Sequence, residues 1–128
     1  MKEFHNPQNI HQPLGLYSHQ VEVSGERLLV LSGQVGMRTD GTVPEDQIDQ
    51  LEVIFENILS NLEAANMSAK DILKLTYYVV GEMDHVKRRA LITSKLGEHR
   101  PCSTFLYVAG LVSPTYKVEV EALASRTD

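Results

Sequence analysis

Cysteine is almost absent from the sequence, which contains one residue of this type, Cys102. A single thiol excludes an internal disulfide framework, and one cysteine with five scattered histidines gives no zinc-binding spacing. The sequence also lacks a run of about 20 consecutive apolar residues, the length that a membrane-spanning helix needs. Its first residues contain no apolar segment of the kind found in a secretory signal. We therefore expect a soluble, cytoplasmic protein that has no metal, no disulfide and no membrane contact.

Positive charge is in deficit, because 12 Lys and Arg residues stand against 17 Asp and Glu residues, giving a formal net charge of −5. The averaged field repels a phosphate backbone, which argues against a nucleic-acid partner. It does not exclude a small anion, because a local group of cations acts at short range. The local candidates are the run Lys87, Arg88 and Arg89, together with Arg100.

The chain of 128 residues has the length of one domain, so a single domain is predicted over 1–128. Residues 1–16, with their prolines and polar side chains, are expected to form an irregular arm. After the arm, alternation of apolar and polar residues predicts strands, and apolar residues three and four positions apart predict helices. The predicted elements are a hairpin of strands at 18–24 and 28–31, a long helix at 44–65, a central strand at 72–80, a second helix at 83–96 with Val86, Ala90 and Leu91 facing inward, and strands at 104–109 and 117–124.

This order, β-β-α-β-α-β-β, predicts an α+β fold in which two helices cover one face of a sheet. The other face would then carry apolar residues such as Tyr78, Val80 or Phe105 without a cover. A monomer rarely exposes an apolar patch of that size. The pattern therefore predicts that copies of the chain associate.

Two glycines follow the second predicted strand, in the segment Ser32-Gly33-Gln34-Val35-Gly36. A residue without a side chain permits a positive φ angle, or lets another group approach the backbone closely, as a bulge or a ligand ledge requires. A plain strand end before the turn at 39–42 explains the same residues equally well. The sequence alone leaves both interpretations open.

Five short motifs, taken together and in order, are characteristic of a known family. They are Tyr17-Ser18-His19, Leu31-Ser32-Gly33-Gln34-Val35, Phe55-Glu56-Asn57-Ile58, Arg100-Pro101-Cys102-Ser103-Thr104 and Val118-Glu119-Val120-Glu121-Ala122. Each is weak alone, but five at matching spacing cover nearly the whole chain, and the sequence resembles the RidA/YjgF family, also labelled endoribonuclease L-PSP. The resemblance implies a chorismate-mutase-like α+β fold. It also implies a homotrimer whose sheets form a central barrel, with sites in the clefts between neighbouring subunits.

The best-known activity of that family is hydrolysis of reactive imine and enamine intermediates to a keto acid and ammonia. An imine carbon is already electrophilic, so the protein has to hold the substrate carboxylate, orient a water molecule and relay protons. No cofactor is needed for this chemistry. The alternative is a non-catalytic trimer that binds a small metabolite. A ribonuclease is disfavoured by the negative net charge and by the lack of a paired-histidine arrangement in the sequence.

The resemblance also suggests site residues. Tyr17 and Glu119 match the tyrosine and the glutamate of active members, and they are the catalytic candidates. Gly33 and Gln34 match the ligand ledge that follows the second strand. Two simpler roles remain open, because Tyr17 also suits a subunit interface and Glu119 also suits the solvated face of a strand.

The sequence departs from the family at the arginine that grips the substrate carboxylate, where it has Ser103. Arg89 stands where active members carry an asparagine on the second helix, so it is a candidate for a compensating cation that faces Gly33, Ser103 and Glu119. A plain surface arginine is the competing interpretation. Arg100, held extended by the following proline, is a second candidate cation. Cys102 lies beside the arginine position, while the frequent family cysteine falls on Phe105, so we interpret Cys102 as a buried structural thiol.

Overall fold

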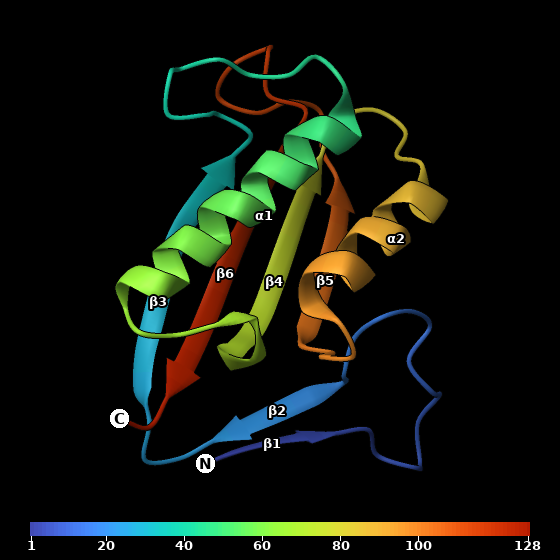
Figure 1. Ribbon diagram of the computed structural model, residues 1–128. Helices are drawn as coiled ribbons and strands as arrows, with labels where there is room; N and C mark the ends of the chain where they lie inside the picture. The colour runs from blue at the N-terminus through green and yellow to red at the C-terminus, as the bar shows by residue number, and fades with distance from the viewer.

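The computed structural model describes residues 1–128 and has the predicted α+β architecture (Figure 1). In chain order the elements are β1 (Lys2–His5), β2 (Gln20–Val23), β3 (Arg27–Val35), α1 (Gln47–Ala64), the 3₁₀ turn η1 (Ala69–Asp71), β4 (Ile72–Val79), α2 (His85–Leu96), β5 (Cys102–Tyr107) and β6 (Val118–Arg126). Four strands form one sheet in the order β3-β6-β4-β5, and both helices lie on the same face of it. Neither helix has the length and apolar character needed to cross a membrane.

Helix α1 forms where the predicted apolar stripe lies. Asp46 caps its N-terminus by accepting a hydrogen bond from the Asp49 backbone N–H at 3.0 Å. Residues three or four apart in the stripe, namely Leu51, Phe55, Ile58 and Leu62, are fully buried against the sheet. The predicted long helix is confirmed, and its burial fixes which face of the sheet becomes the core.

Strand β4 is the predicted central strand and lies between β6 and β5. It runs antiparallel to β6 and parallel to β5, with Tyr77 opposite Val120 on one side and Phe105 on the other. Leu75, Tyr77 and Val79 point to the helices and are almost completely buried. The site described below is built on this half of the sheet.

The start of the chain differs from prediction. Residues 2–5 of the expected irregular arm form β1, which pairs antiparallel with β2, while β3 pairs with β6. The predicted hairpin between 18–24 and 28–31 is therefore wrong. Glu26 holds the β1–β2 pair to the sheet by accepting hydrogen bonds from Lys2 Nζ and Ser125 Oγ, both at 2.8 Å. A strand of four residues whose only aromatic or aliphatic member is Phe4 gives too weak an alternation to be recognised.

Helix α2 begins after Asp84, which accepts hydrogen bonds from the backbone N–H groups of Val86 and Lys87. Its rotation about the helix axis differs from prediction, since Val86 is 81% exposed and Ala90 is exposed as well. The inward stripe instead contains Leu91, Ile92 and Leu96. Arg88 lies one helical turn before Ile92 on the same stripe, so a charged side chain occupies an inward position.

The face of the sheet opposite the helices is open in a single chain. Leu28, Val30 and Leu106 are 64%, 65% and 45% exposed there, and Tyr78 also lies on this face. Phe105 was suggested for the uncovered face, but it points toward the helices and packs against the core. The uncovered apolar surface is the feature that led us to predict association.

We predict a trimer near three times 14.3 kDa in light scattering, because the open sheet face must be covered. Val30→Asp places a charge on that face and is expected to give smaller species at micromolar concentration. Val86→Asp is the matched control, since it puts the same charge on the outward side of α2. A well-folded wild-type monomer at micromolar concentration would contradict the prediction.

Candidate functional site

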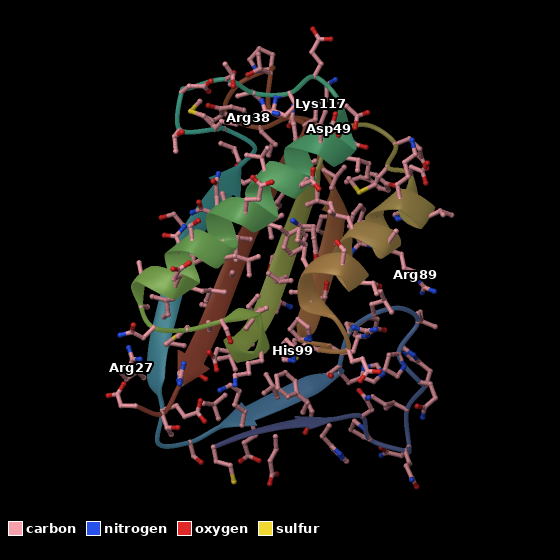
Figure 2. All side chains as sticks on the ribbon, viewed as in Figure 1. Arg27, Arg38, Asp49, Arg89, His99 and Lys117 are labelled. Atoms are coloured by element: carbon pink, nitrogen blue, oxygen red, sulfur yellow. The ribbon has the colours of Figure 1, made fainter.

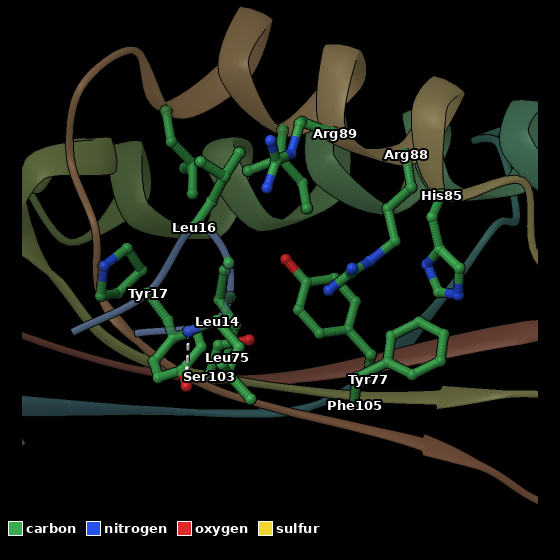
Figure 3. Close-up of a pocket in the computed structure, with 14 residues that line it drawn as sticks. Leu14, Leu16, Tyr17, Leu75, Tyr77, His85, Arg88, Arg89, Ser103 and Phe105 are labelled. Carbon is green, nitrogen blue, oxygen red and sulfur yellow. Dashed lines mark hydrogen bonds between the residues drawn. The ribbon is translucent and has the colours of Figure 1, made fainter. Parts of the chain in front are cut away.

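A pocket of about 330 Å³ lies beneath α2, between that helix and the β4–β5 half of the sheet (Figure 3). Residues Leu14 to Tyr17 close one side of it. They belong to the segment between β1 and β2, which we call the N-terminal arm. Eight of its 14 lining residues are hydrophobic, and none is an aspartate or a glutamate. The pocket therefore combines hydrophobic walls with polar groups, and its charged groups are all cationic.

Arg88 is the charged group that reaches furthest beneath the helix. Its guanidinium carbon lies 4.6 Å from the centre of the Tyr77 ring and 4.4 Å from the centre of the Phe105 ring. Such cation–π contacts stabilise the charge in part. The Nε atom is buried and has no hydrogen-bond partner. Burial lowers the pKa of Arg88, yet a guanidinium remains protonated at neutral pH.

Tyr77 forms the floor of the pocket under Arg88 (Figure 3). Burial raises the pKa of its hydroxyl to about 12, and the nearby Arg88 charge opposes that shift only in part. The hydroxyl is therefore neutral at physiological pH. The aromatic rings of Tyr77 and Phe105 thus hold the Arg88 guanidinium in place, and neither ring carries a charge that would neutralise it.

Three of the residues predicted for the site line this pocket: Tyr17, Arg89 and Ser103. The Tyr17 hydroxyl accepts a hydrogen bond from the Leu14 backbone N–H at 3.1 Å, which leaves its own proton available to donate. Ser103 points from β5 to the helix side of the sheet and is half-buried. Arg89 is exposed and extends from α2 toward the N-terminal arm (Figure 2).

His85 stands at the opposite end of the pocket from Tyr17 (Figure 3). Its Nε2 atom lies 3.1 Å from the Tyr107 hydroxyl, which also accepts a hydrogen bond from the Met83 backbone N–H at 3.3 Å. The tautomer of the imidazole sets which of these two atoms, His85 Nε2 or the Tyr107 hydroxyl oxygen, carries the proton of the bond between them. The His85 ring also contacts Phe105 edge to face, at 5.3 Å between ring centres.

Gly33 and Glu119 meet on the other face of the sheet. A Cβ atom added to Gly33 would lie 1.9 Å from Oε2 of Glu119, so the glutamate carboxylate rests against the glycine backbone. The register of β3 and β6 shifts between Leu31 and Gln34, which confirms the bulge interpretation of this segment. Gln34 is tied locally, since its Nε2 donates to the Ser32 carbonyl at 2.9 Å.

One chain does not bring all the predicted site residues together. Tyr17, Arg89 and Ser103 lie on the helix side of the sheet, while Glu119 opposes Tyr78 and lies on the open side next to Gly33. Within a single chain Arg89 does not face Gly33 and Glu119, and the prediction that they meet concerns a cleft between subunits.

Arg100 lies outside the pocket. Its Nη1 donates hydrogen bonds to the backbone carbonyls of Gly97 at 2.7 Å and His99 at 2.9 Å, so the side chain binds the end of α2. Cys102 is half-buried on the open side of β5, where burial raises the pKa of its thiol. A raised pKa reduces the thiolate fraction, in agreement with a structural rather than a nucleophilic thiol.

Two histidines that are separated in the sequence are neighbours in the structure. The rings of His11 and His19 lie 4.9 Å apart in the N-terminal arm. Each ring already has one nitrogen hydrogen-bonded to a backbone carbonyl, His11 to Gln12 and His19 to His11, both at 2.7 Å. The pair could not be recognised in the sequence because it forms only when the arm folds back on itself.

Sequence reasoning named Arg88 only as one member of a basic run, and it missed Tyr77 and His85 as pocket residues. The signal for Arg88 was present, since it stands four residues before Ile92 and eight before Leu96 on one helix stripe. It was hidden because three consecutive basic residues are usually interpreted as a solvated surface.

Comparison with known proteins agrees with the architecture. The family model described as endoribonuclease L-PSP matches residues 8–126. A RutC family protein of Pyrococcus horikoshii is 31% identical over 97% of this chain and 98% of its own length. TdcF of Escherichia coli, provisionally named a reactive intermediate deaminase, is 28% identical over 99% of both chains.

Solved structures show the same fold. YyfB of Yersinia pestis, from the Rid protein family, superposes with a TM-score of 0.85 at 24% identity, covering 96% of this chain and 97% of its own. The E. coli TdcF structure with bound serine gives a TM-score of 0.72 at 27% identity, covering 98% and 99% of the two chains. The motifs, the α+β topology and the family match together show that the chain belongs to the endoribonuclease L-PSP family, the family of RidA and YjgF.

Proposed function

We propose that the protein is a cytoplasmic, homotrimeric hydrolase that converts small imine or enamine carboxylates to keto acids and ammonia without a cofactor. The observation that carries the proposal is the pocket beneath α2, where Tyr17 and Ser103, from two separate family motifs, converge with the half-buried Arg88. A pocket of this volume, near the lower end of the range of roughly 300–1,000 Å³ for ligand sites, suits a molecule of amino-acid size. The serine bound by TdcF is a ligand of that class.

The chemistry requires few groups. A cation holds the substrate carboxylate, a base orients water toward the electrophilic C=N carbon, and an acid protonates the departing nitrogen. In the proposed mechanism, Glu119 orients the water and the Tyr17 hydroxyl, whose proton is free, donates to the nitrogen. Ammonia leaves as the new C=O bond forms, so one water molecule is consumed for each imine.

The proposed trimer accounts for the separation of these groups within one chain. Glu119 and Gly33 lie on the open face of the sheet, and the pocket lies on the helix face. They would form one site only if the open face of one subunit meets the pocket of its neighbour. The intersubunit cleft is thus required by the proposal, and a monomer would be inactive.

The second candidate is a non-catalytic trimer that binds a small metabolite. It is favoured by Ser103, because a neutral hydroxyl replaces the charged anchor of active relatives. Ribonuclease activity is a weaker candidate, since the net charge is −5.

Glu119→Gln should reduce imine hydrolysis by about 100-fold while leaving the trimer intact, because an amide cannot act as a base. The measurement is keto-acid formation when the protein is added to an amino-acid dehydratase that releases imines. Glu121→Gln, two residues along the same strand, is the matched control and should retain activity. Equal activity of the wild type and Glu119→Gln would favour the binding protein over the hydrolase.

Ser103→Arg should raise activity on the imines that a dehydratase releases, because it restores a cation at the position that active relatives use. Wild-type turnover on those imines should be weaker than that of an arginine-bearing relative. The comparison is made by kcat/KM in the same coupled assay. A wild-type kcat/KM equal to that of the arginine-bearing relative would show that Ser103 does not reduce activity on these substrates.

Gly33→Ala should fold and assemble but displace the Glu119 carboxylate, since a methyl group at Gly33 would overlap Oε2. The glutamate end is flexible, so it gives way before the backbone does. We expect thermal unfolding close to wild type, a rotated Glu119 side chain in a crystal structure, and a loss of hydrolysis comparable with that of Glu119→Gln. An unmoved Glu119 carboxylate would contradict the close packing described above.

A further inference from the structure

We propose that Arg88 is the carboxylate-binding residue of this protein and that the pocket around it selects carboxylates with apolar side chains. The inference deepens the proposed function and depends on it only in taking the pocket beneath α2 as the ligand site. Arg88 lies on helix α2, whereas Ser103, at the position where the resemblance places an arginine, lies on strand β5.

The guanidinium of Arg88 is held in a fixed orientation but lacks a hydrogen-bond acceptor at Nε. Contacts at 4.6 Å and 4.4 Å to the Tyr77 and Phe105 ring centres limit its movement on the ring side. The buried Nε has no partner in the protein. A buried donor without an acceptor costs free energy. A ligand that supplies an acceptor to Nε would remove this cost and so gain binding free energy. A carboxylate fits best, because its two oxygens match the Nε and Nη donors along one edge of a guanidinium.

No acidic side chain competes for this charge. The pocket lining contains Arg88, Arg89 and His85 but no carboxylate, and the ion pairs of the structure involve neither arginine. A partly buried cation without a counter-charge attracts an anion more strongly than the same cation in water. The negative net charge of the chain therefore does not determine what this pocket binds.

Arg89 differs from Arg88 in its surroundings, although the two are adjacent. It is exposed at the rim, where water and salt screen its charge, whereas Arg88 is half-buried against aromatic rings. Arg89 can attract an anion toward the entrance, but its side chain has no fixed orientation to recognise a carboxylate. A substitution of Arg89 is therefore the matched control for the same substitution of Arg88.

The rest of the pocket determines what is attached to the carboxylate. Leu16, Leu75, Ile92 and Leu96 line the space next to the guanidinium. These walls gain free energy from contact with an aliphatic group and offer no partner to a hydroxyl. Carboxylates with a branched aliphatic side chain should therefore bind better than small ones.

The test uses stable 2-oxo acids, which resemble the imines but do not react with water in the same way. Isothermal titration of the wild-type trimer should give 4-methyl-2-oxopentanoate an affinity about tenfold or more above that of pyruvate, from the burial of additional methyl and methylene groups. Arg88→Met keeps the aliphatic stem and should weaken binding of both acids by about tenfold to hundredfold. Arg89→Met should change either affinity by less than about threefold.

A neutral ligand separates carboxylate recognition from damage to the fold. Binding of 4-methylpentan-2-one, which lacks the carboxylate, should be the same in the wild type and Arg88→Met. If Arg88→Met does not fold, a crystal structure of the wild type with 4-methyl-2-oxopentanoate decides, with a carboxylate oxygen expected within about 3 Å of Arg88 Nε. A carboxylate bound elsewhere, an unchanged affinity in Arg88→Met, or equal affinities for pyruvate and the branched acid would each overturn the inference.

These binding measurements need no turnover. If 2-oxo acids bind through Arg88 but imines are not hydrolysed, the inference stands and the hydrolase proposal fails. If imines are hydrolysed and Arg88→Met has the wild-type KM, the hydrolase proposal stands and this inference fails.

Discussion

Two helices cover one face of a four-stranded sheet, and this constraint decides where the other features of the molecule lie. Leu51, Phe55 and Leu62 of α1 bury the middle of the sheet, and α2 covers the β4–β5 edge. No helix remains for the opposite face, which keeps Val30 and its neighbours exposed. The candidate pocket lies between α2 and the sheet, and the N-terminal arm, rather than another helix, closes its remaining side.

Much of the fold could be predicted because it depends on local periodicity. The stripe of α1 and the β-branched and aromatic residues of β4 are properties of continuous segments, and both elements were found where expected. Strand pairing is not local. β3 pairs with β6 across most of the sequence, and no pattern within β2 or β3 distinguishes that partner from the adjacent strand. The hairpin prediction failed for this reason.

Which residues belong to the site could be predicted better than how those residues are arranged in space. Motif matching named Tyr17, Ser103 and Arg89, which share one pocket, and Gly33 and Glu119, which touch one another. It did not separate the two groups, because a side chain moves to the other face of a sheet when the register shifts by one residue. Arg88 was named as part of a basic run but not singled out, because charged residues are seldom buried without a partner and the sequence context favoured a surface position.

Strand β6 is the last element of the chain, yet it lies between β3 and β4 in the sheet. Arg27 of β3 is paired with Arg126, so the sheet has no complete core until the final strand has been inserted. Contacts between residues so far apart in sequence make folding slow, since the loop must close before the pairing can stabilise it. During synthesis on the ribosome, the edges of β3 and β4 that pair with β6 therefore remain unpaired until β6 has been made. The nascent chain is most prone to aggregate in that interval.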